Sequence, residues 1–172
     1  MNENNSDEIM GGIKSSKKQF DTILKICLMI GIIIVSGFII YHAFKPEPGF
    51  VTFGILNENQ EAENYPTQAS INESIYFYLT VDNHLDGIFS FNIKIKKGNT
   101  TTVLSSAGSN GTLEYILNGS LKHKEKWMSN RLNVSFSQTG VNQIIITELW
   151  QNFVSKPEEF YNILWLRINI TS

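Results

Sequence analysis

The chain has 172 residues, and its 14 Lys and Arg side chains nearly balance 16 Asp and Glu, for a formal net charge of −2. This balance leaves no strongly basic surface, so composition argues against a nucleic-acid partner. No internal repeat or low-complexity block is present, which excludes fibrous and repeat architectures.

Residues 1–22 form the first segment, and their polar and charged side chains lack apolar periodicity. Segments of low hydrophobicity do not bury enough apolar surface to offset the entropy of ordering. The pattern predicts a disordered tail, placed in the cytoplasm by the orientation argued below.

Residues 23–44 form the second segment, which carries no charged side chain after Lys25 until Lys45. A bilayer core of roughly 30 Å needs about 20 mostly apolar helical residues. The segment therefore predicts one transmembrane helix. The alternatives are a buried core helix, which needs a larger protein around it, and a cleaved signal peptide. A cleaved signal requires a short basic head and small residues before the cut, whereas Tyr41 stands at that place here.

The lysines are unequally distributed about this helix. Four precede or open it (Lys14, Lys17, Lys18 and Lys25), and only Lys45 lies close to its other end. Positively charged flanks stay on the cytoplasmic side. We therefore expect a cell-membrane protein with a cytoplasmic N-terminus and an extracellular C-terminal domain.

Residues 45–49 predict a short spacer, because two prolines disfavour helix. Residues 50–172 then alternate apolar and polar side chains with a period of two, the mark of half-buried antiparallel strands. About seven such runs, separated by turn signals, predict an all-β, immunoglobulin-like antiparallel β-sandwich. The run from Val141 to Trp150 is apolar on both faces and predicts a central strand. Cys27 is the single cysteine, so the domain is expected to lack disulfides.

Asn-x-Ser/Thr sequons are frequent in the predicted external part, and they are candidate glycosylation sites. A further sequon at Asn4 lies on the side predicted to be cytoplasmic, so an Asn-rich sequence also generates sequons by accident. Three candidates lie in predicted turns, and Asn133 and Asn169 lie on the outward faces of predicted strands. The candidates are Asn72, Asn99, Asn110, Asn118, Asn133 and Asn169.

The order of short motifs resembles a known family. The segment "AENYP" is followed by a strand ending in "VDNH", then by a Lys-Trp pair and a final pair of strands. This resembles the external domain of an archaeal family of predicted membrane proteins, the domain of unknown function sixteen-sixteen. The resemblance covers about Gly49 to Ile170 and implies fold and location, but no reaction. Typical members carry several N-terminal membrane helices, whereas this chain has one. The matching residues are Tyr65, Pro66, Asn83, His84, Lys126 and Trp127.

The same residues can also be interpreted without the family resemblance. Pro66 restricts Tyr65 to extended backbone, so the chain leaves its first strand without forming a helix. The segment "VDNHLDG" has the residue types of a turn between strands. Its alternative interpretation is a calcium or sugar site formed by Asp82, Asn83, His84 and Asp86. The segment "KHKEKW" predicts an edge strand protected by lysines, and its alternative is a surface that contacts a polysaccharide.

No catalytic pattern is evident in the sequence. The predicted external part has no cysteine, its two histidines lack defined partners, and no zinc spacing or phosphate loop occurs. Glu158 and Glu159 form an acidic pair that fits a solvated loop better than acid–base chemistry. We expect a protein that is not an enzyme and needs no metal or cofactor.

The predicted function is a membrane-anchored surface domain that binds or scaffolds an envelope protein or glycan. The alternatives are a pilin-like filament subunit and, less favoured, an envelope glycan enzyme. The filament alternative lacks the small residue expected at a processing site before "KKQF".

Overall fold

A computed structural model describes residues 4–45 and 48–172, with side chains from residue 19 onward in the first range. The chain divides into two compact units, Met1–Glu47 and Pro48–Ser172, and each is described by itself. The predicted spacer at 45–49 includes two residues, 46 and 47, that fall outside the described ranges.

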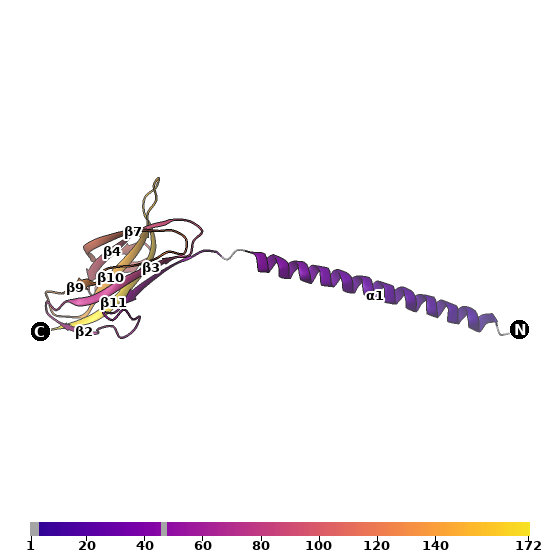
Figure 1. Cartoon of the computed structure of the whole chain (residues 1–172). Coiled ribbons are helices and arrows are strands. Elements are labelled where there is room, and N and C mark those ends of the chain that lie inside the picture. The colour runs from indigo at the N-terminus through magenta and orange to yellow at the C-terminus, as the bar shows by residue number, and fades with distance from the viewer. Residues whose placement is uncertain (1–3, 46–47) are drawn as a thin grey trace. The chain divides into compact units, whose positions relative to one another are not determined.

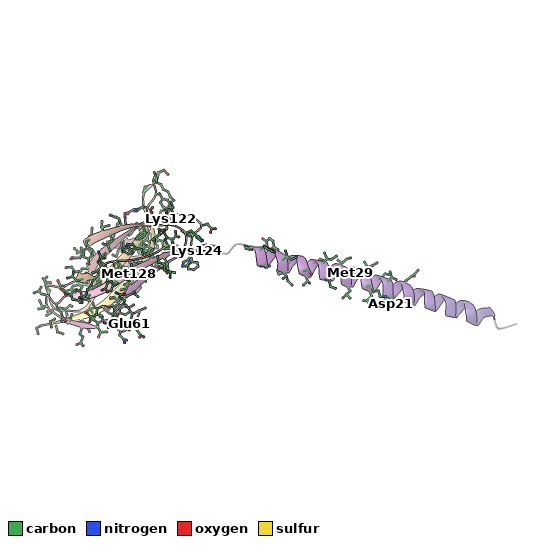
Figure 2. All side chains as sticks on the ribbon, in the orientation of Figure 1. Asp21, Met29, Glu61, Lys122, Lys124 and Met128 are labelled. Atoms are coloured by element: carbon green, nitrogen blue, oxygen red, sulfur yellow. The ribbon has the colours of Figure 1, made fainter. Side chains whose placement is uncertain are left out.

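The first unit is one α-helix, α1, which spans Asn4–Phe44. The expectation that residues 1–22 are disordered is therefore wrong from Asn4 onward. Extending an existing helix adds a hydrogen bond for each residue without a new nucleation step. The helix of the apolar segment therefore continues into the polar segment that precedes it. Within α1, residues Gln19–Phe44 are long and apolar enough to cross a membrane. Their side chains, such as Met29, are exposed along the whole stretch (Figure 2).

The second unit is a sandwich of two sheets (Figure 1). The larger sheet has the strand order β2 (Gln68–Ser70), β11 (Glu159–Thr171), β10 (Gly140–Gln151), β4 (Phe89–Gly98) and β7 (Thr112–Leu121). All its neighbours are antiparallel except β2 and β11. In the smaller sheet, β3 (Ile75–Asn83) pairs with β1 (Val51–Leu56), β8 (Lys126–Met128) and β9 (Leu132–Val134). A hairpin of β5 (Leu104–Ser105) and β6 (Gly108–Ser109) completes the unit.

The predicted all-β, immunoglobulin-like sandwich after an N-terminal helix is confirmed. The core forms where the two sheets face each other, and alternating residues of β3 and β4 supply much of it. Every inward residue that the sequence predicts for these strands is buried, whereas their neighbours are only half-buried. The fully buried core side chains from the two strands are Phe77, Leu79, Val81, Phe89, Phe91, Ile93 and Ile95.

β10 is a central strand, as predicted, and lies between β4 and β11. Its residues from Ile144 to Leu149 are buried on both faces of the sheet. The hairpin β5–β6 contributes to this cover, because Gly108 packs against Glu148 and Trp150. Gly108 has a φ of +95°, and a Cβ atom there would lie 3.0 Å from the Trp150 ring. Glycine meets both demands.

Strand direction divides the connections of the sandwich between two ends. The entry end holds the start of β1 together with the connections 84–88, 122–125 and 152–158. The far end holds the turn after β4 and the connection between β9 and β10. Chain connectivity thus places the entry end next to the segment that leads to α1.

Candidate functional site: a polar groove at the far end of the sandwich

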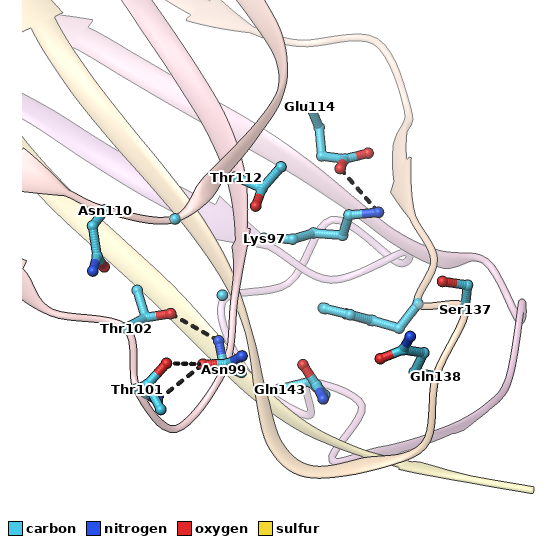
Figure 3. A pocket seen from close by; sticks show the side chains of 13 residues that line it. Lys97, Asn99, Thr101, Thr102, Asn110, Thr112, Glu114, Ser137, Gln138 and Gln143 are labelled. Carbon is cyan, nitrogen blue, oxygen red and sulfur yellow. Dashed lines mark hydrogen bonds and ion pairs between the residues drawn. The ribbon is translucent and has the colours of Figure 1, made fainter.

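An open groove with a volume of about 390 Å³ lies at the far end of the domain (Figure 3). Ligand sites in proteins have volumes of roughly 300–1,000 Å³. The end of β4, the start of β7 and the connection before β10 form its walls, and amide and hydroxyl side chains predominate in its lining. The polar residues that line it are Lys97, Asn99, Thr101, Thr102, Asn110, Thr112, Glu114, Ser137, Gln138 and Gln143.

The two charged side chains of the groove neutralise each other. Lys97 Nζ lies 2.9 Å from Glu114 Oε1 on the neighbouring strand, and it also donates to the Ser135 carbonyl at 3.2 Å. The same ammonium lies 5.9 Å from the centre of the Phe136 ring, which forms part of the groove wall. The groove therefore offers a neutral, hydrogen-bonding surface rather than a site for a charged ligand.

The turn after β4 is held by its own side chains. Asn99 Oδ1 accepts hydrogen bonds from the backbone N–H of Thr101 at 2.9 Å and from its hydroxyl at 2.7 Å. Asn99 N–H donates to Thr102 Oγ1 at 2.8 Å (Figure 3). Asn110 Oδ1 accepts from Val103 N–H at 2.9 Å. Both amide oxygens are used internally, and the amide nitrogens keep no partner among the residues described.

Gln138 and Gln143 complete the set of free amides. Neither side chain forms a hydrogen bond within the described part of the chain, although both line the groove (Figure 3). Each amide offers donors and an acceptor. Planar amides and hydroxyls around a concave surface match the hydrogen-bonding groups of a sugar or of a peptide backbone.

The structure exposes most of the predicted glycosylation candidates. Asn72, Asn99, Asn110, Asn118 and Asn133 are exposed. Asn118 lies within β7 and not in a turn, so that part of the prediction is wrong; its Asn-Gly pair suggested a turn, but the strand continues through it. Asn169 is half-buried, and its Oδ1 accepts from Asn142 N–H at 3.0 Å. Two candidates, Asn99 and Asn110, line the groove itself.

The residues of the family resemblance hold structural positions. Asn83 is fully buried at the end of β3, where its Nδ2 donates to the carbonyls of Gly87 at 2.8 Å and Leu121 at 2.9 Å. Its Oδ1 accepts from Leu85 N–H at 2.9 Å. The imidazole ring of His84 stacks on Phe50 with 4.6 Å between the ring centres. The predicted turn after β3 is thus present, and Asn83 fastens it.

The other residues of that resemblance are divided between two places. Tyr65 packs against the core and donates its hydroxyl to the Ile55 carbonyl at 2.7 Å, and Pro66 follows it half-buried. Burial raises the pKa of the Tyr65 phenol. Lys126 and Trp127 open β8, an edge strand opposite the end of β3. The predicted edge strand over "KHKEKW" is therefore present only at its last two residues, because 122–125 form a connection. Lys126 Nζ pairs with Asp82 Oδ2 at 2.9 Å.

The alternative cation site in the turn after β3 is not formed. Asp82 pairs with Lys126, and the Asn83 amide is consumed by the backbone. Within residues 19–45 and 48–172, no group of three or more His, Cys, Asp or Glu side chains is placed to hold a metal ion. Glu158 and Glu159 also do not act together, because Glu158 pairs with Lys94 and Glu159 with Lys156.

The buried carboxylate of Glu148 is not predicted by any pattern in the sequence. Glu148 on β10 is completely buried and accepts from Lys96 Nζ at 2.8 Å, from Ser109 N–H at 2.7 Å and from Ser109 Oγ at 2.6 Å. Trp150 Nε1 donates to its other oxygen at 3.0 Å. Burial alone would raise the pKa of this carboxyl, but the four donors outweigh burial and lower that pKa. Glu148 therefore ties the hairpin to the sheet rather than serving an accessible site.

Comparisons with known proteins bear on the fold alone. No protein-family model and no curated protein matches the chain. Among solved structures, the chain is similar to a CARDB domain from Pyrococcus furiosus in complex with di-metal ions, at 17% identity and a TM-score of 0.46, over 73% of this chain and 90% of that one. A solution structure of the same domain matches at 16% identity and 0.46, over 73% and 97%. A β-glucosidase from Listeria innocua in complex with glucose matches at 10% identity and 0.44, over 75% of this chain but only 17% of its own.

Proposed function

We propose that this protein is a single-pass, membrane-anchored surface protein whose β domain has a binding role in the cell envelope. The apolar stretch Gln19–Phe44 of α1 carries the proposal, because 26 residues of helix measure about 39 Å and exceed the roughly 30 Å of a bilayer core. Its side chains find no cover within the described chain, and lipid supplies that cover.

The proposed orientation places α1's N-terminus in the cytoplasm and the domain outside. The four lysines that precede or open the apolar stretch support it, against a single lysine at its other end. The β domain needs nothing from α1 to bury its core, since the buried cluster consists only of residues from Val51 onward. Such a domain can be displayed at the end of an anchor.

Extraction and N-terminal sequencing test the anchor. We expect the protein to remain in membranes washed with alkaline carbonate, to dissolve in detergent, and to retain its Met1 end. Release by carbonate, or a mature protein that begins after α1, would overturn the anchor in favour of a cleaved signal. A cut just before α1 with a retained helix would instead favour the pilin-like filament subunit.

The groove at the far end is the proposed binding site, and its ligand class is a neutral polar chain, with an envelope glycan preferred. The internally paired Lys97 and Glu114 make a charged ligand unfavourable, whereas the free amides of Gln138 and Gln143 match sugar hydroxyls. Binding rather than catalysis is proposed because no converging carboxylates line this groove. The expected absence of enzymatic activity, cofactor and metal remains a prediction.

Binding can be tested with the full chain in lipid nanodiscs and purified polysaccharides from the native envelope. We expect saturable binding that Gln138→Ala and Gln143→Ala weaken, because each removes a donor and an acceptor. Asn130→Ala is the matched control, since Asn130 is exposed between β8 and β9 and does not line the groove. Equal binding by the two groove variants and the control would exclude the groove.

Glycosylation of the exposed sequons is part of the same proposal, because it requires the domain to be outside. Mass spectrometry of the natural protein is expected to find glycan on at least one of Asn72, Asn99, Asn110, Asn118 and Asn133. Unmodified peptides for all five would contradict it. The resemblance to the archaeal membrane-protein family likewise stays a prediction.

A further inference from the structure

The entry end of the β domain is a rigid assembly of connections from distant parts of the sequence. Asn83 joins two of them, because its side chain bonds Gly87 and Leu121 while Lys124 N–H donates to its carbonyl at 2.7 Å. The connection 152–158 is held next to them, since Asn152 N–H donates to the Ser90 carbonyl at 2.7 Å. These connections therefore present one surface.

Apolar side chains occupy exposed positions on that surface. Ile88 is 69% exposed after the turn of β3 and β4, Phe50 is 53% exposed before β1, and Val154 is fully exposed between β10 and β11. Each belongs to a different segment, and none of the three joins the core cluster. Exposed apolar residues are ordinary, and Val141 and Val103 are comparably exposed at the far end. The entry end differs because its three apolar side chains lie at the end that is tethered to α1.

Cations accompany the apolar tips. Lys122 and Lys124 are exposed in the connection after β7, and neither forms an ion pair in the described part of the chain (Figure 2). His123 lies between them, and its Nδ1 donates to the Leu85 carbonyl, 2.7 Å away. Two acidic side chains, Asp86 and Glu125, are exposed on the same connections. The Asp86 carboxylate lies 4.0 Å from His123, and Glu125 Oε2 accepts from Lys122 N–H at 2.7 Å. Lysines beside exposed apolar side chains suit the surface of a lipid bilayer, where phosphate groups lie outside the hydrocarbon core.

The tether limits which surface the entry end can meet. Gly49 packs directly on the backbone of His84 and Leu85, where an added Cβ atom would lie 2.7 Å from each. The link between α1, which ends at Phe44, and this fixed point is therefore only five residue steps long. At most about 18 Å can separate the two Cα atoms, even with the link fully extended.

We propose that the entry end docks on the lipid surface of the membrane that holds α1. Phe50, Ile88 and Val154 enter the headgroup region, and Lys122 and Lys124 contact lipid phosphates. This inference rests on the proposed membrane anchor. Docking directs the far end, with its groove, away from the membrane, and the ten residues of β4 between the two ends measure about 33 Å.

Lipid quenching of a fluorescent probe tests the docking. The full chain with Cys27→Ser is reconstituted into phosphatidylcholine vesicles that contain a minor fraction of phosphatidylglycerol. An environment-sensitive probe is attached to Ile88→Cys, Val154→Cys or Val141→Cys, the last being 68% exposed at the far end. We expect a blue shift and several-fold stronger quenching by spin-labelled lipids at residues 88 and 154 than at residue 141. Equal quenching at the three positions would overturn the docking.

Two further arms separate the possible failures. A probe at Ser36→Cys, inside α1, reports whether the helix itself lies in lipid. Quenching there without quenching at residues 88 and 154 removes the docking and leaves the anchor. No quenching at residue 36 removes both. A probe at Lys124→Cys tests the role of the apolar side chains. The double variant Ile88→Ser with Val154→Ser is expected to reduce quenching of this probe by at least half, whereas the control Val141→Ser leaves it unchanged. Unchanged quenching in the double variant would contradict the role of the apolar side chains.

Discussion

Lys96 on β4 and Glu148 on β10 form an ion pair of 2.8 Å on the face of the larger sheet that points away from the core. The Glu148 side chain is fully buried and that of Lys96 is 14% exposed. Lys96 Nζ also donates to the Ser109 carbonyl at 2.8 Å, while Ser109 donates twice to Glu148. Three residues from three strands thus attach the hairpin β5–β6 to the sheet.

Removing the cation of this pair is expected to destabilise the domain strongly. Lys96→Met leaves Glu148 as a buried charge without a counter-ion, a change that typically costs about 3–5 kcal/mol in the free energy of unfolding. Urea unfolding followed by circular dichroism measures it. Lys126→Met is the control. The Lys126 side chain is exposed, so its ion pair with Asp82 is expected to contribute only about 0–1 kcal/mol to the free energy of unfolding.

A double variant makes the cause testable even if Lys96→Met barely folds. Adding Glu148→Gln removes the charge that needs a partner, and the amide oxygen can still accept from Ser109. The double variant is therefore expected to be more stable than Lys96→Met alone. A double variant that is equally unstable would assign the loss to packing rather than to charge.

The same carboxylate predicts how stability depends on pH. The pKa of Glu148 is lower in the folded domain than its ordinary value of 4.5, and Lys94 likewise lowers the pKa of Glu158. A carboxyl with a lowered folded pKa contributes its full stabilisation above the unfolded value and loses it as pH falls through the folded value. The urea midpoint is therefore expected to be unaffected by these groups from neutral pH to about 5 and to fall below 4.5. Glu148→Gln should show a shallower acid decline, and an identical decline would rule out Glu148 as a major contributor.

Much of the fold is predictable from local pattern. Alternation in β3 and β4 assigns every core residue of those strands, because one face of each meets the other sheet and the other does not. The apolar character of β10 correctly indicates burial on both faces. Short strands such as β2, β8 and β9 are too brief to show a period, which explains why about seven strands are expected and eleven are present in the described part of the chain.

The candidate site is less predictable, because it depends on which strands become neighbours. Glu148 stands in the sequence as a lone acid in an apolar strand. Only the register of β10 on β4, which pairs Glu148 with Lys94 and places Lys96 two positions along the same face, lets Lys96 Nζ reach it at 2.8 Å. The groove joins Lys97, Asn110 and Gln138, which no sequence spacing links. Asn92 similarly appears as a free outward side chain, whereas it donates to Glu158 at 3.2 Å and accepts from Asn152 at 2.7 Å.

The assignment of the two faces of the larger sheet yields a third prediction. Phe91→Asp places a carboxylate in the core, where Phe91 is fully buried and packs against Trp127 with 5.5 Å between ring centres. An unpaired buried charge costs several kcal/mol, which is on the order of the whole stability of a domain of this size. Asn118→Asp, on the exposed face of β7, is expected to change the urea midpoint only slightly. Comparable losses in the two variants would mean that the faces are wrongly assigned.

Sidedness of the membrane supplies the last prediction. With Cys27 replaced by Ser, a single cysteine is placed at Val103, which is 63% exposed next to the hairpin, or at Ser6 near the N-terminus. Ser109 would be a poor site in the same region, because its hydroxyl and backbone N–H hold Glu148. A membrane-impermeant maleimide is expected to label Val103→Cys on intact cells and Ser6→Cys only after the cells are opened, since the lysines that precede the apolar stretch favour the cytoplasmic side. Labelling of Ser6→Cys alone on intact cells would reverse the topology. It would also remove the basis for glycan at the exposed sequons, because the domain would then lie in the cytoplasm.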